Sequence, residues 1–503
     1  MPENSRAKPM TNQTNSVFSQ LKDSSLVHHS SYIAGQFQSG RSGHFAVHNP
    51  ADGALLALVA EAGATEAEQA VTAAAAAFPA WSGHTAAERA ALLMRWYQLM
   101  LDHQQDLARI LTLEQGKPLE EAAGEIGYGA SFVSWFAEEA KRMNGDIIPA
   151  AKTSQQILVL KQAIGVVAAI TPWNFPNAMI LRKAAAALAA GCTFVVKPSE
   201  LTPLSALALA ELASRAGIPA GVFNVVTGTD AKAIGQVLTK DSRVAKFSFT
   251  GSTPVGKTLL AQCASTVKKV SMELGGNAPF IVFDDADLAA AVQGLLAAKF
   301  RNAGQTCVCV NRVFVQRPVY DAFLAQLIKA TAPLKLASGL EAGCQIGPLI
   351  NQAAVDKITR LLDQALDQGA ELLLGGAIDA DLGPLFFQPT IVTEVTADMQ
   401  ISKTEIFGPV LCISVFDTEQ EAIELSNHTP TGLASYFYSR DIGRIFRVAK
   451  ALDYGMVGVN EGLISNAAAP FGGVKESGLG REGSSYGLDD FTELKYICLG
   501  GLS

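Results

Sequence analysis

The sequence contains no run of lysine or arginine, although 39 of its residues are basic and 47 are acidic. A protein that binds a phosphate backbone usually gathers its basic residues into a stripe or patch, so we expect no nucleic-acid partner. A long apolar run is missing as well. Residues 162–181 carry no charge, but two prolines and two asparagines interrupt them, which argues against a membrane span.

Cysteine is scarce and irregularly spaced. The seven cysteines form no CxxC pair and no metal-ligand spacing, so we expect reduced thiols, no bound metal and a cytoplasmic location. The first 25 residues lack the apolar segment of a secretory signal, and we expect residues 1–25 to form a flexible N-terminal tail.

Helical and strand patterns alternate along most of the chain, whose 503 residues are too many for a single core. Residues 64–115 repeat apolar positions every three or four residues, which predicts long amphipathic helices that end at Gly116 and Pro118. From residue 165, short β-prone runs such as GVVAAI and TFVVK alternate with alanine-rich helical segments. This alternation predicts βαβ units and a mostly parallel sheet.

A second alternating series begins after Leu274, so the sequence predicts a second α/β domain. The C-terminal segment TELKYICLG alternates like an isolated strand, and the extended residues 152–162 are a candidate partner for it. Such an arm often mediates oligomers, although an ordinary edge hairpin fits the pattern equally well.

A phosphate-loop pattern occurs at residues 251–258. The strand-like AKFSFT leads into GSTPVGKT, and the later FIVFD imitates the strand that holds a metal ion in P-loop nucleotide hydrolases. Three β-prone runs precede this turn, however, and Pro254 removes one N–H group that should hold phosphate. A plain strand-to-helix turn, with Lys257 as a solvated cation, is the competing interpretation.

Cys307 and Cys309 lie in the polar turn of FRNAGQTCVCVN. Each is either a reactive thiol or a small buried residue. A catalytic cysteine needs a donor for the oxyanion that it creates and helpers for proton transfer. The motif MELGGNAP carries Glu273 before a Gly-Gly turn, and TPWNFP carries Asn174, so the sequence supplies an acid and an amide beside the thiol.

Seven motifs occur in the order found in the NAD(P)-dependent aldehyde dehydrogenases, namely TPWNFP, KPSE, FTGS, MELGGNAP, GQTCVC, EIFGPV and PFGGVKESGLGRE. The sequence resembles this family from about residue 30 to its end, and the separation of 34 residues between Glu273 and Cys307 also matches. The resemblance makes the FTGSTPVGK turn a nucleotide-binding turn, which leaves the P-loop hydrolase without further support.

The resemblance implies an α/β, aldehyde dehydrogenase-like fold. Its parts are a Rossmann-type NAD-binding domain (residues 26–147 and 165–274), an α/β catalytic domain (275–480) and a small β oligomerisation arm (148–164 and 484–503). It further implies a homo-oligomer, either a dimer or a tetramer.

Catalytic roles also follow from the resemblance. Cys307 is the expected nucleophile, which forms a thiohemiacetal and then a thioester, while the Asn174 amide and the Cys307 N–H hold the oxyanion. Glu273 is the expected general base that activates water, with its pKa raised by an apolar setting. Glu482 is either part of a proton relay or an exposed structural glutamate.

The family's cofactor-binding positions correspond to Thr171, Trp173, Lys197, Ser199, Glu200, Gly251, Ser252, Leu274, Glu405 and Phe407. Glu405 is expected to hold the nicotinamide ribose, with Phe407 beside the ring. Lys197 and Glu200 resemble the pair that hydrogen-bonds the adenosine ribose, where a carboxylate repels a 2′-phosphate. NAD is therefore favoured, and NADP is the alternative if Lys197 binds that phosphate.

Within the family, the sequence is very similar to the succinate-semialdehyde dehydrogenases, which place two arginines and a serine around the distal carboxylate of the substrate. The matching residues are Arg182, Arg301 and Ser465. Arg301 lies six residues before Cys307, and a cation in an apolar channel needs an anion. Either arginine could instead extend to solvent or pair with an internal carboxylate.

The implied reaction is the oxidation of succinate semialdehyde to succinate with reduction of NAD(P). Glutarate semialdehyde is the alternative substrate, because one methylene group changes binding by only about 1–3 kcal/mol. A catalytically silent structural relative is a further alternative, although such a protein would have no chemical need for Cys307, Glu273 and Asn174 together.

Cys309 is a candidate redox partner of Cys307. In an extended segment their Cα atoms would lie ~6.6 Å apart, at the upper limit for a disulfide, so a bent loop permits a reversible link. A packing role for Cys309 is the alternative.

Overall fold

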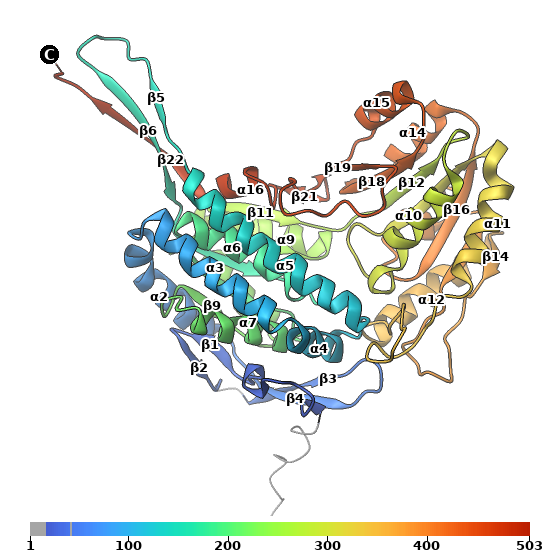
Figure 1. Cartoon of the computed structure of the whole chain (residues 1–503), viewed down its shortest axis with the longest axis horizontal. Coiled ribbons are helices and arrows are strands. Elements are labelled where there is room, and N and C mark those ends of the chain that lie inside the picture. The colour runs from blue at the N-terminus through green and yellow to red at the C-terminus, as the bar shows by residue number, and fades with distance from the viewer. Residues whose placement is uncertain (1–16, 41–42, 503) are drawn as a thin grey trace, which may run out of the picture.

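The computed structural model describes residues 17–40 and 43–502, which form two α/β bodies and a projecting three-stranded arm (Figure 1). Residues 1–16 of the predicted tail lie outside the described residues. Its remaining part packs onto the first body, where Phe18 and Leu21 are buried and the N–H groups of Lys22 and Asp23 donate to the carboxylate of Asp106. No helix of the described residues is long and apolar enough to cross a membrane.

An eight-stranded sheet in the order β2-β1-β9-β8-β7-β10-β11-β21 forms the first body. The five strands from β9 to β11 run parallel. The strands are β1 (Ser31–Ile33), β2 (Gln36–Gln38), β7 (Val166–Ile170), β8 (Thr193–Lys197), β9 (Phe223–Val225), β10 (Val244–Thr250), β11 (Lys269–Glu273) and β21 (Gly478–Leu479). Strand β7 reads VVAAI without polar alternation, as expected for a strand covered on both faces.

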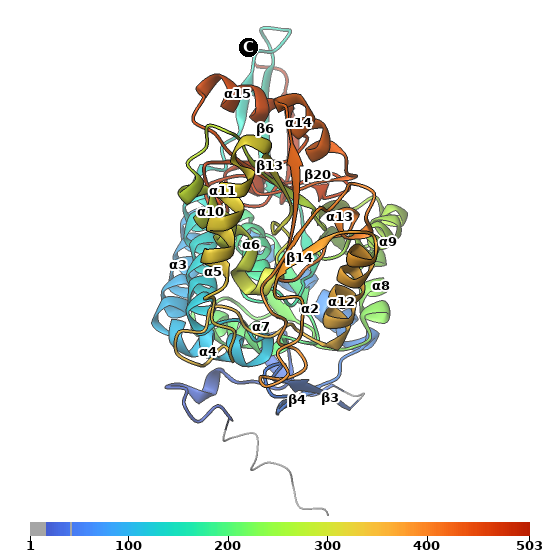
Figure 2. The same cartoon turned by 90° about the vertical axis from the view of Figure 1, so that its right-hand side faces the viewer.

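Helices cover both faces of this sheet. They are α2 (Ala64–Ser82), α3 (Ala86–Asp102), α4 (Gln104–Gln115), α5 (Leu119–Glu139), α6 (Ala178–Ala190), α7 (Pro203–Arg215), α8 (Ala231–Lys240), α9 (Thr253–Cys263) and the short α16 (Tyr486–Asp489). One apolar core joins α3, α5, α6 and α7 to one face, and another joins α2, α8 and α9 to the other. Figure 2 shows α3 and α5 on one side and α8 and α9 on the opposite side.

Local sequence signals explain where these helices begin and end. Thr85 and Glu88 form a capping box at the start of α3, in which each side chain accepts from the other residue's N–H group. Helix α4 ends at Gly116, whose φ of 96° lies in the left-handed region that favours glycine. The end predicted at Gly116 and Pro118 is therefore confirmed.

The second body is a seven-stranded sheet in the order β14-β15-β16-β13-β12-β18-β19. Its strands are β12 (Ala278–Val282), β13 (Val310–Gln316), β14 (Glu371–Leu374), β15 (Thr390–Thr393), β16 (Val410–Phe416), β18 (Ala434–Tyr438) and β19 (Met456–Val459). Its helices are α10 (Leu288–Phe300), α11 (Tyr320–Thr331), α12 (Gln352–Asp367), α13 (Gln400–Lys403), α14 (Glu419–Asn427) and α15 (Ile442–Ala451). The predicted second α/β series is confirmed.

Small sheets complete the fold. Strand β3 (His44–His48) pairs with β4 (Leu55–Ala60), and β17 (Thr431–Gly432) pairs with β20 (Val474–Lys475). The sequence assigned residues 478–479 to the catalytic domain, but β21 is antiparallel to β11 in the first sheet. A two-residue strand carries no periodicity, so sequence patterns could not reveal this return of the chain.

The arm consists of β5 (Asp146–Ile148), β6 (Gln156–Ala163) and β22 (Thr492–Leu499), in the order β22-β6-β5. Strands β22 and β6 are antiparallel from Thr492 opposite Ala163 to Leu499 opposite Gln156, which confirms the pairing expected for these two segments. The arm extends away from both bodies and carries the described C-terminal end of the chain (Figure 1).

Candidate active site

The strand order of the first sheet reverses between β7 and β10, which is where open parallel sheets place their ligands. A cavity of about 380 Å³ lies at the carboxyl ends of these strands and extends to the second body. It is lined by Pro172, Trp173, Asn174, Phe175, Met179, Thr250, Gly251, Ser252, Glu273, Leu274, Gly275, Cys307, Ile350, Asn351, Ala353, Ala354, Lys357, Glu405, Ile406 and Phe407. The three predicted catalytic residues thus share one cavity.

Cys307 follows an unusual turn. Asn302, Ala303 and Gly304 have φ values of 52°, 54° and 76°, so three successive residues adopt the left-handed conformation. Such strain is typical of functional segments. Cys307 is partly exposed to the cavity, and burial raises the pKa of its thiol to about 12 although the guanidinium of Arg182 opposes this shift. The thiol is therefore protonated at neutral pH and needs a base to become a nucleophile.

Glu273 ends β11 and is almost completely buried. Neither of its carboxylate oxygens has a hydrogen-bond partner among the described residues. Burial, together with the nearby Glu482 carboxylate, raises the pKa of Glu273 to about 8. An acid with a pKa close to neutrality can both accept and release a proton, which is what general base catalysis requires.

Asn174 lies in the loop between β7 and α6, and its side chain points toward the turn that carries Cys307. The Nδ2 atom donates to the carbonyl of Gln305 at 3.1 Å, and the Oδ1 atom accepts from the N–H group of Phe175 at 3.1 Å. A side-chain amide has two N–H groups, so one donor is left for a ligand in the cavity. This geometry suits an oxyanion donor.

Behind Glu273, the carboxylate of Glu482 contacts two buried cations. Arg182 approaches it at 2.7 Å, and Lys183 donates both to Glu482 and to the Thr250 hydroxyl. Burial by itself raises the pKa of Glu482, but these cations outweigh it and lower the pKa below its ordinary value. Glu482 is therefore a buried anion, and the alternative of an exposed structural glutamate is excluded.

The predicted substrate residues do not line the catalytic cavity itself. Arg182 is buried, with its guanidinium 3.8 Å from the ring centroid of Phe471. Arg301 is half-buried, 5.2 Å from the ring centroid of Phe175, and the described residues place no carboxylate within ion-pairing distance of it. Ser465 lines a neighbouring hollow of about 640 Å³ against α5.

Tyr128 is a residue that the sequence did not single out. It lies on α5 in the same hollow as Ser465, and burial raises its pKa although Arg182 and Arg301 oppose this shift. A tyrosine in the amphipathic α5 gives no signal in a sequence, because core packing alone accounts for it. Its hydroxyl is nevertheless close to both predicted arginines.

Most of the predicted cofactor residues lie at the carboxyl ends of neighbouring strands of the first sheet, whereas Glu405 and Phe407 precede β16 of the second body. Thr171 follows β7, Lys197 ends β8, and Ser199 and Glu200 come after it. The members of this set that line the catalytic cavity are Trp173, Gly251, Ser252, Leu274, Glu405 and Phe407. The Nζ atom of Lys197 lies 3.1 Å from Glu200 Oε2. Glu405 accepts from the N–H group of Gly276, and burial raises its pKa to about 7.

Three observations fit a dinucleotide at this edge. Helix α9 starts directly at the cavity and its N-cap, Ser252, makes no side-chain cap, so backbone N–H groups are left for an anion. A Cβ atom at Gly251 would lie 2.4 Å from the Phe249 ring, so any other residue there would force the ring to move. The buried hydroxyl of Thr171 has no partner among the described residues.

The phosphate-loop interpretation is wrong. Lys257 is an exposed residue that pairs with Glu476 at 2.7 Å instead of turning back over the loop. Strand β12, which was compared with a metal-holding strand, belongs to the second sheet, whereas β10 belongs to the first. Asp284, at the end of that run, pairs with Arg444.

Cys309 is buried, and its thiol is directed at the carbonyls of Lys299 and Val310 at 3.6 and 3.5 Å. Burial raises its pKa. All seven cysteines are free in this structure. A link to Cys307 would require the Cys309 side chain to leave these carbonyls.

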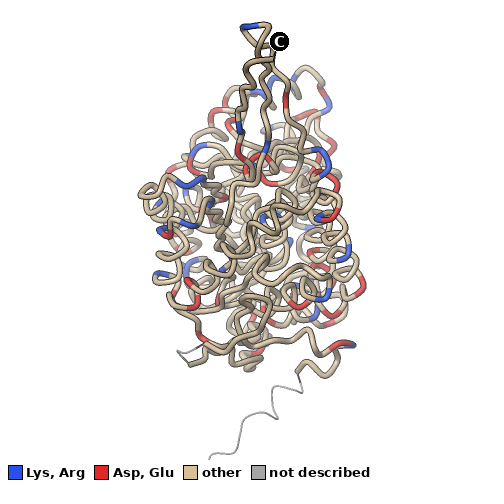
Figure 3. Tube along the Cα trace, turned by 90° about the vertical axis from the view of Figure 1, so that its left-hand side faces the viewer, with Lys and Arg blue, Asp and Glu red and all other residues tan. Residues whose placement is uncertain are grey.

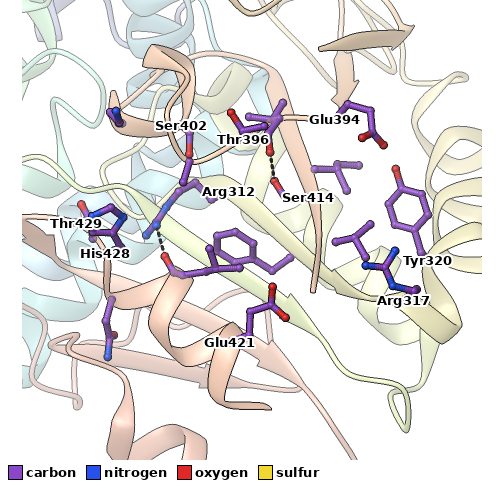
Figure 4. A pocket seen from close by; sticks show the side chains of 18 of the residues that line it. Arg312, Arg317, Tyr320, Glu394, Thr396, Ser402, Ser414, Glu421, His428 and Thr429 are labelled. Carbon is purple, nitrogen blue, oxygen red and sulfur yellow. Dashed lines mark hydrogen bonds between the residues drawn. The ribbon is translucent and has the colours of Figure 1, made fainter. Parts of the chain in front are cut away.

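A larger hollow of about 870 Å³ lies on the second body, and Figure 4 shows its labelled side chains, among them Arg312, Arg317 and Glu421. Arg312 donates to the main-chain carbonyls of Asn277, Leu425 and Ser426, so its donors are used within the protein. None of the predicted site residues lines this hollow. On the face shown in Figure 3, basic and acidic residues are interspersed.

Comparisons with known proteins agree with this geometry. The family model described as "Aldehyde dehydrogenase family" matches residues 37–497. A 3-sulfolactaldehyde dehydrogenase of Pseudomonas putida is 60% identical over 96% of this chain and 99% of its own length. A glutarate-semialdehyde dehydrogenase of Pseudomonas aeruginosa is 56% identical over 96% of this chain and all of its own.

Two further relatives carry the name of succinate-semialdehyde dehydrogenase. The Escherichia coli enzyme GabD, whose name specifies NADP(+), is 56% identical over 95% of this chain and 99% of its own. The crystal structure of the enzyme from Burkholderia pseudomallei superimposes with a TM-score of 0.94 at 56% identity, covering 96% of this chain and all of that one.

Proposed function

The chain belongs to the aldehyde dehydrogenase family and is an NAD(P)-dependent oxidoreductase, and on this premise we propose that its substrate is an aldehyde with an anionic far end, succinate semialdehyde in the first place. The product is the corresponding carboxylic acid, here succinate. The single observation that supports this choice is Arg301, a half-buried cation that precedes the nucleophile. No carboxylate of the described residues lies within ion-pairing distance of it, and Glu121 interacts with it only at longer range.

The anion would be held by Arg301, Arg182 and Ser465. Because Arg182 already contacts Glu482 at 2.7 Å, we assign the larger share of the binding to Arg301. A charge-assisted hydrogen bond contributes roughly 1.5–3 kcal/mol, and a bidentate contact to a carboxylate adds orientation. Tyr128, in the hollow beside Ser465, would offer a further hydroxyl.

The chain's own residues carry the covalent chemistry. Glu273 takes the proton of the Cys307 thiol and passes it to solvent, and the sulfur bonds to the aldehyde carbon. This gives a thiohemiacetal whose oxygen accepts from Asn174 and from the Cys307 N–H group. A bound NAD(P)⁺ would supply the hydride acceptor, through which the thiohemiacetal would be oxidised to a thioester. Glu273 then takes a proton from water, and the water oxygen bonds to the thioester carbon. The carbon–sulfur bond breaks, the acid leaves, and the Cys307 sulfur regains a proton from Glu273.

Ten residues would hold the cofactor: Thr171, Trp173, Lys197, Ser199, Glu200, Gly251, Ser252, Leu274, Glu405 and Phe407. We propose a preference for NAD, because the Glu200 carboxylate forms an ion pair with Lys197 and would repel a 2′-phosphate. Glu200 is the more exposed residue of this pair, however. If the 2′-phosphate of NADP displaced the Glu200 carboxylate from Lys197, the enzyme would also accept NADP.

Two other substrates also carry an anion that Arg301 would bind. Glutarate semialdehyde is one methylene group longer, a difference of only about 1–3 kcal/mol. A sulfonated aldehyde has the same separation of an aldehyde from an anion, and the 60% identical relative from Pseudomonas putida carries that activity in its name. The proposal therefore ranks these two directly after succinate semialdehyde.

We also propose that the arm mediates a dimer or tetramer in the cytoplasm. The arm exposes large apolar side chains, Ile147, Leu494 and Tyr496, whose exposed fractions are 74%, 68% and 63%. Apolar residues of this size on a projecting sheet are typical of an interface. Free thiols throughout the chain fit a reducing compartment.

The test of the proposed function is a comparison of kcat/KM for succinate semialdehyde, glutarate semialdehyde, 3-sulfolactaldehyde and an uncharged aldehyde of similar length, with formation of the reduced cofactor as the signal. We expect a strong preference for the anionic substrates. Equal use of the uncharged aldehyde would contradict the anion site while leaving aldehyde oxidation intact.

A further inference from the structure

A buried ion pair beside the oxyanion loop has no part in the chemistry described so far. Lys117 lies between α4 and α5, and its side chain and that of Glu125, on α5, are completely buried. The Nζ atom of Lys117 lies 2.6 Å from Glu125 Oε2. A buried ion pair contributes little net stability, because the loss of hydration offsets the attraction between the charges.

The ammonium group of Lys117 makes two hydrogen bonds and also contacts an aromatic ring. One N–H group meets Glu125, another donates to the main-chain carbonyl of Asn174 at 2.7 Å, and the ammonium group lies 3.8 Å from the ring centroid of Phe175. The ammonium thus contacts the backbone of the very residue whose amide faces Cys307, and the side chain of the next one.

Glu125 fixes the other end of the same loop. Its Oε1 atom accepts from the N–H groups of Asn177 and Ala178, at 3.0 and 3.2 Å, where α6 begins. Figure 1 shows α5 lying alongside α6. One ion pair therefore holds the loop at residue 174 and again at residues 177–178.

The backbone that carries Lys117 is tightly packed. A Cβ atom at Gly339 would lie 2.3 Å from the carbonyl oxygen of Lys117, and one at Gly347 would lie 2.2 Å from that of Gly116. The N–H group of Leu119 donates to the Gly339 carbonyl. This close packing of backbone against backbone joins the first body to the second body, which carries Cys307.

We infer that Lys117 and Glu125 are positioning residues, which hold the Asn174 amide at the place where the oxyanion of the substrate forms. Neither touches the substrate. They act through the loop of residues 174–178, since Lys117 fixes its first carbonyl and Glu125 fixes its last N–H groups. The inference rests on the aldehyde oxidation proposed above.

The test is a double-mutant cycle on kcat with succinate semialdehyde. Lys117→Met keeps the length of the side chain but removes its donors, and a misplaced catalytic group costs up to roughly 100-fold in rate. We expect kcat to fall roughly 10- to 100-fold in Lys117→Met, with a smaller change in KM. In the Asn174→Ala background we expect Lys117→Met to change kcat by less than about twofold, because the positioned group is already gone.

Lys268→Met is the matched control. Lys268 is also a buried lysine that donates to a main-chain carbonyl, that of Asp241, but it does not contact the oxyanion loop. We expect its kcat to stay close to that of the wild type. If Lys117→Met fails to fold, Glu125→Gln replaces it in the cycle, since this change keeps the side-chain shape and removes only the charge.

An unchanged kcat in Lys117→Met would overturn the inference. So would an equal fold-loss in the wild-type and Asn174→Ala backgrounds, because it would mean that Lys117 acts independently of Asn174. The wild type is assayed first with all four aldehydes. A wild type that oxidises none of them would refute the proposed function itself and the inference with it, and an active wild type separates the two outcomes.

Discussion

The Nη2 atom of Arg182 lies 2.7 Å from the Oε2 atom of Glu482, and both side chains are almost completely buried. The two residues come from α6 and from the loop after β21, and the Phe471 ring lies against the guanidinium. One of the two arginines expected at the substrate thus has a structural partner next to the general base. This pairing gives Arg182 and Arg301 different roles in the account.

Arg182→Met should lower stability more than it lowers affinity for the substrate. The change leaves Glu482 with one cation instead of two, and breaking a buried pair from one side costs about 3 kcal/mol. The midpoint of urea unfolding measures this effect. Arg142→Met is the control, since Arg142 forms a surface pair with Glu139 that should contribute no more than about 1 kcal/mol. Equal midpoints for both variants would contradict the prediction.

Glu273 should give the reaction a pH dependence with a midpoint near 8. Its pKa is raised to about 8 by burial and by the nearby Glu482, and only the ionised form can accept a proton from water. The rate of thioester hydrolysis should therefore rise as the pH rises through 8 and level off above it. Single-turnover acid release across this range checks the profile. Glu273→Gln should lower the hydrolysis rate roughly 10²–10⁴-fold and should remove its pH dependence. If the rate of the mutant still rises through pH 8, Glu273 is not the group that causes this rise.

Glu200→Gln should shift the cofactor preference toward NADP. Removal of the negative charge ends the repulsion of a 2′-phosphate and frees Lys197, whose Nζ atom lies 3.1 Å from Glu200 in the native chain. We expect the ratio of kcat/KM for NADP to that for NAD to rise about tenfold, which corresponds to about 1.4 kcal/mol. If the ratio does not change, the adenosine ribose is bound elsewhere.

Cys309→Ala tests the proposed redox link. Peroxide would oxidise the two thiols of Cys307 and Cys309 to a disulfide and would itself be reduced to water, and an added thiol would reverse the reaction. In the wild type we expect mild peroxide to remove activity and thiol to restore it, and we expect Cys309→Ala to abolish this reversible loss. The same recovery in both proteins would assign Cys309 a packing role, in keeping with its contacts to two carbonyls.

Two of the three catalytic residues that the family resemblance assigned lie at the ends of parallel strands, whereas Cys307 precedes β13. Glu273 ends β11, and Asn174 follows β7. Parallel strands bring their carboxyl ends to one edge of a sheet, so motifs that follow such strands meet without any knowledge of tertiary contacts. The pairing of β22 with β6 was predictable for another reason. Apolar and polar residues alternate in the C-terminal segment as in a strand, and residues 152–162 were an extended segment that could pair with it.

The parts that sequence patterns missed depend on contacts between distant segments. Nothing in the periodicity of α6 shows that Arg182 meets Glu482, which arrives from a loop near the end of the chain. Lys117 lies between Gly116 and Pro118, where the sequence predicts only a helix end, and the fold brings it to the carbonyl of Asn174. The phosphate-loop pattern failed for the opposite reason, since any strand-to-helix turn that needs small residues can match it.

The central claim is that Arg301 binds the anionic end of the substrate. The most direct measurement compares kcat/KM of the wild type and of Arg301→Gln for succinate semialdehyde and for an uncharged aldehyde of similar length. We expect a loss of roughly 10- to 100-fold for succinate semialdehyde, because a charge-assisted contact contributes roughly 1.5–3 kcal/mol, and little change for the uncharged aldehyde. An equal loss for both substrates, or no loss for either, would contradict it.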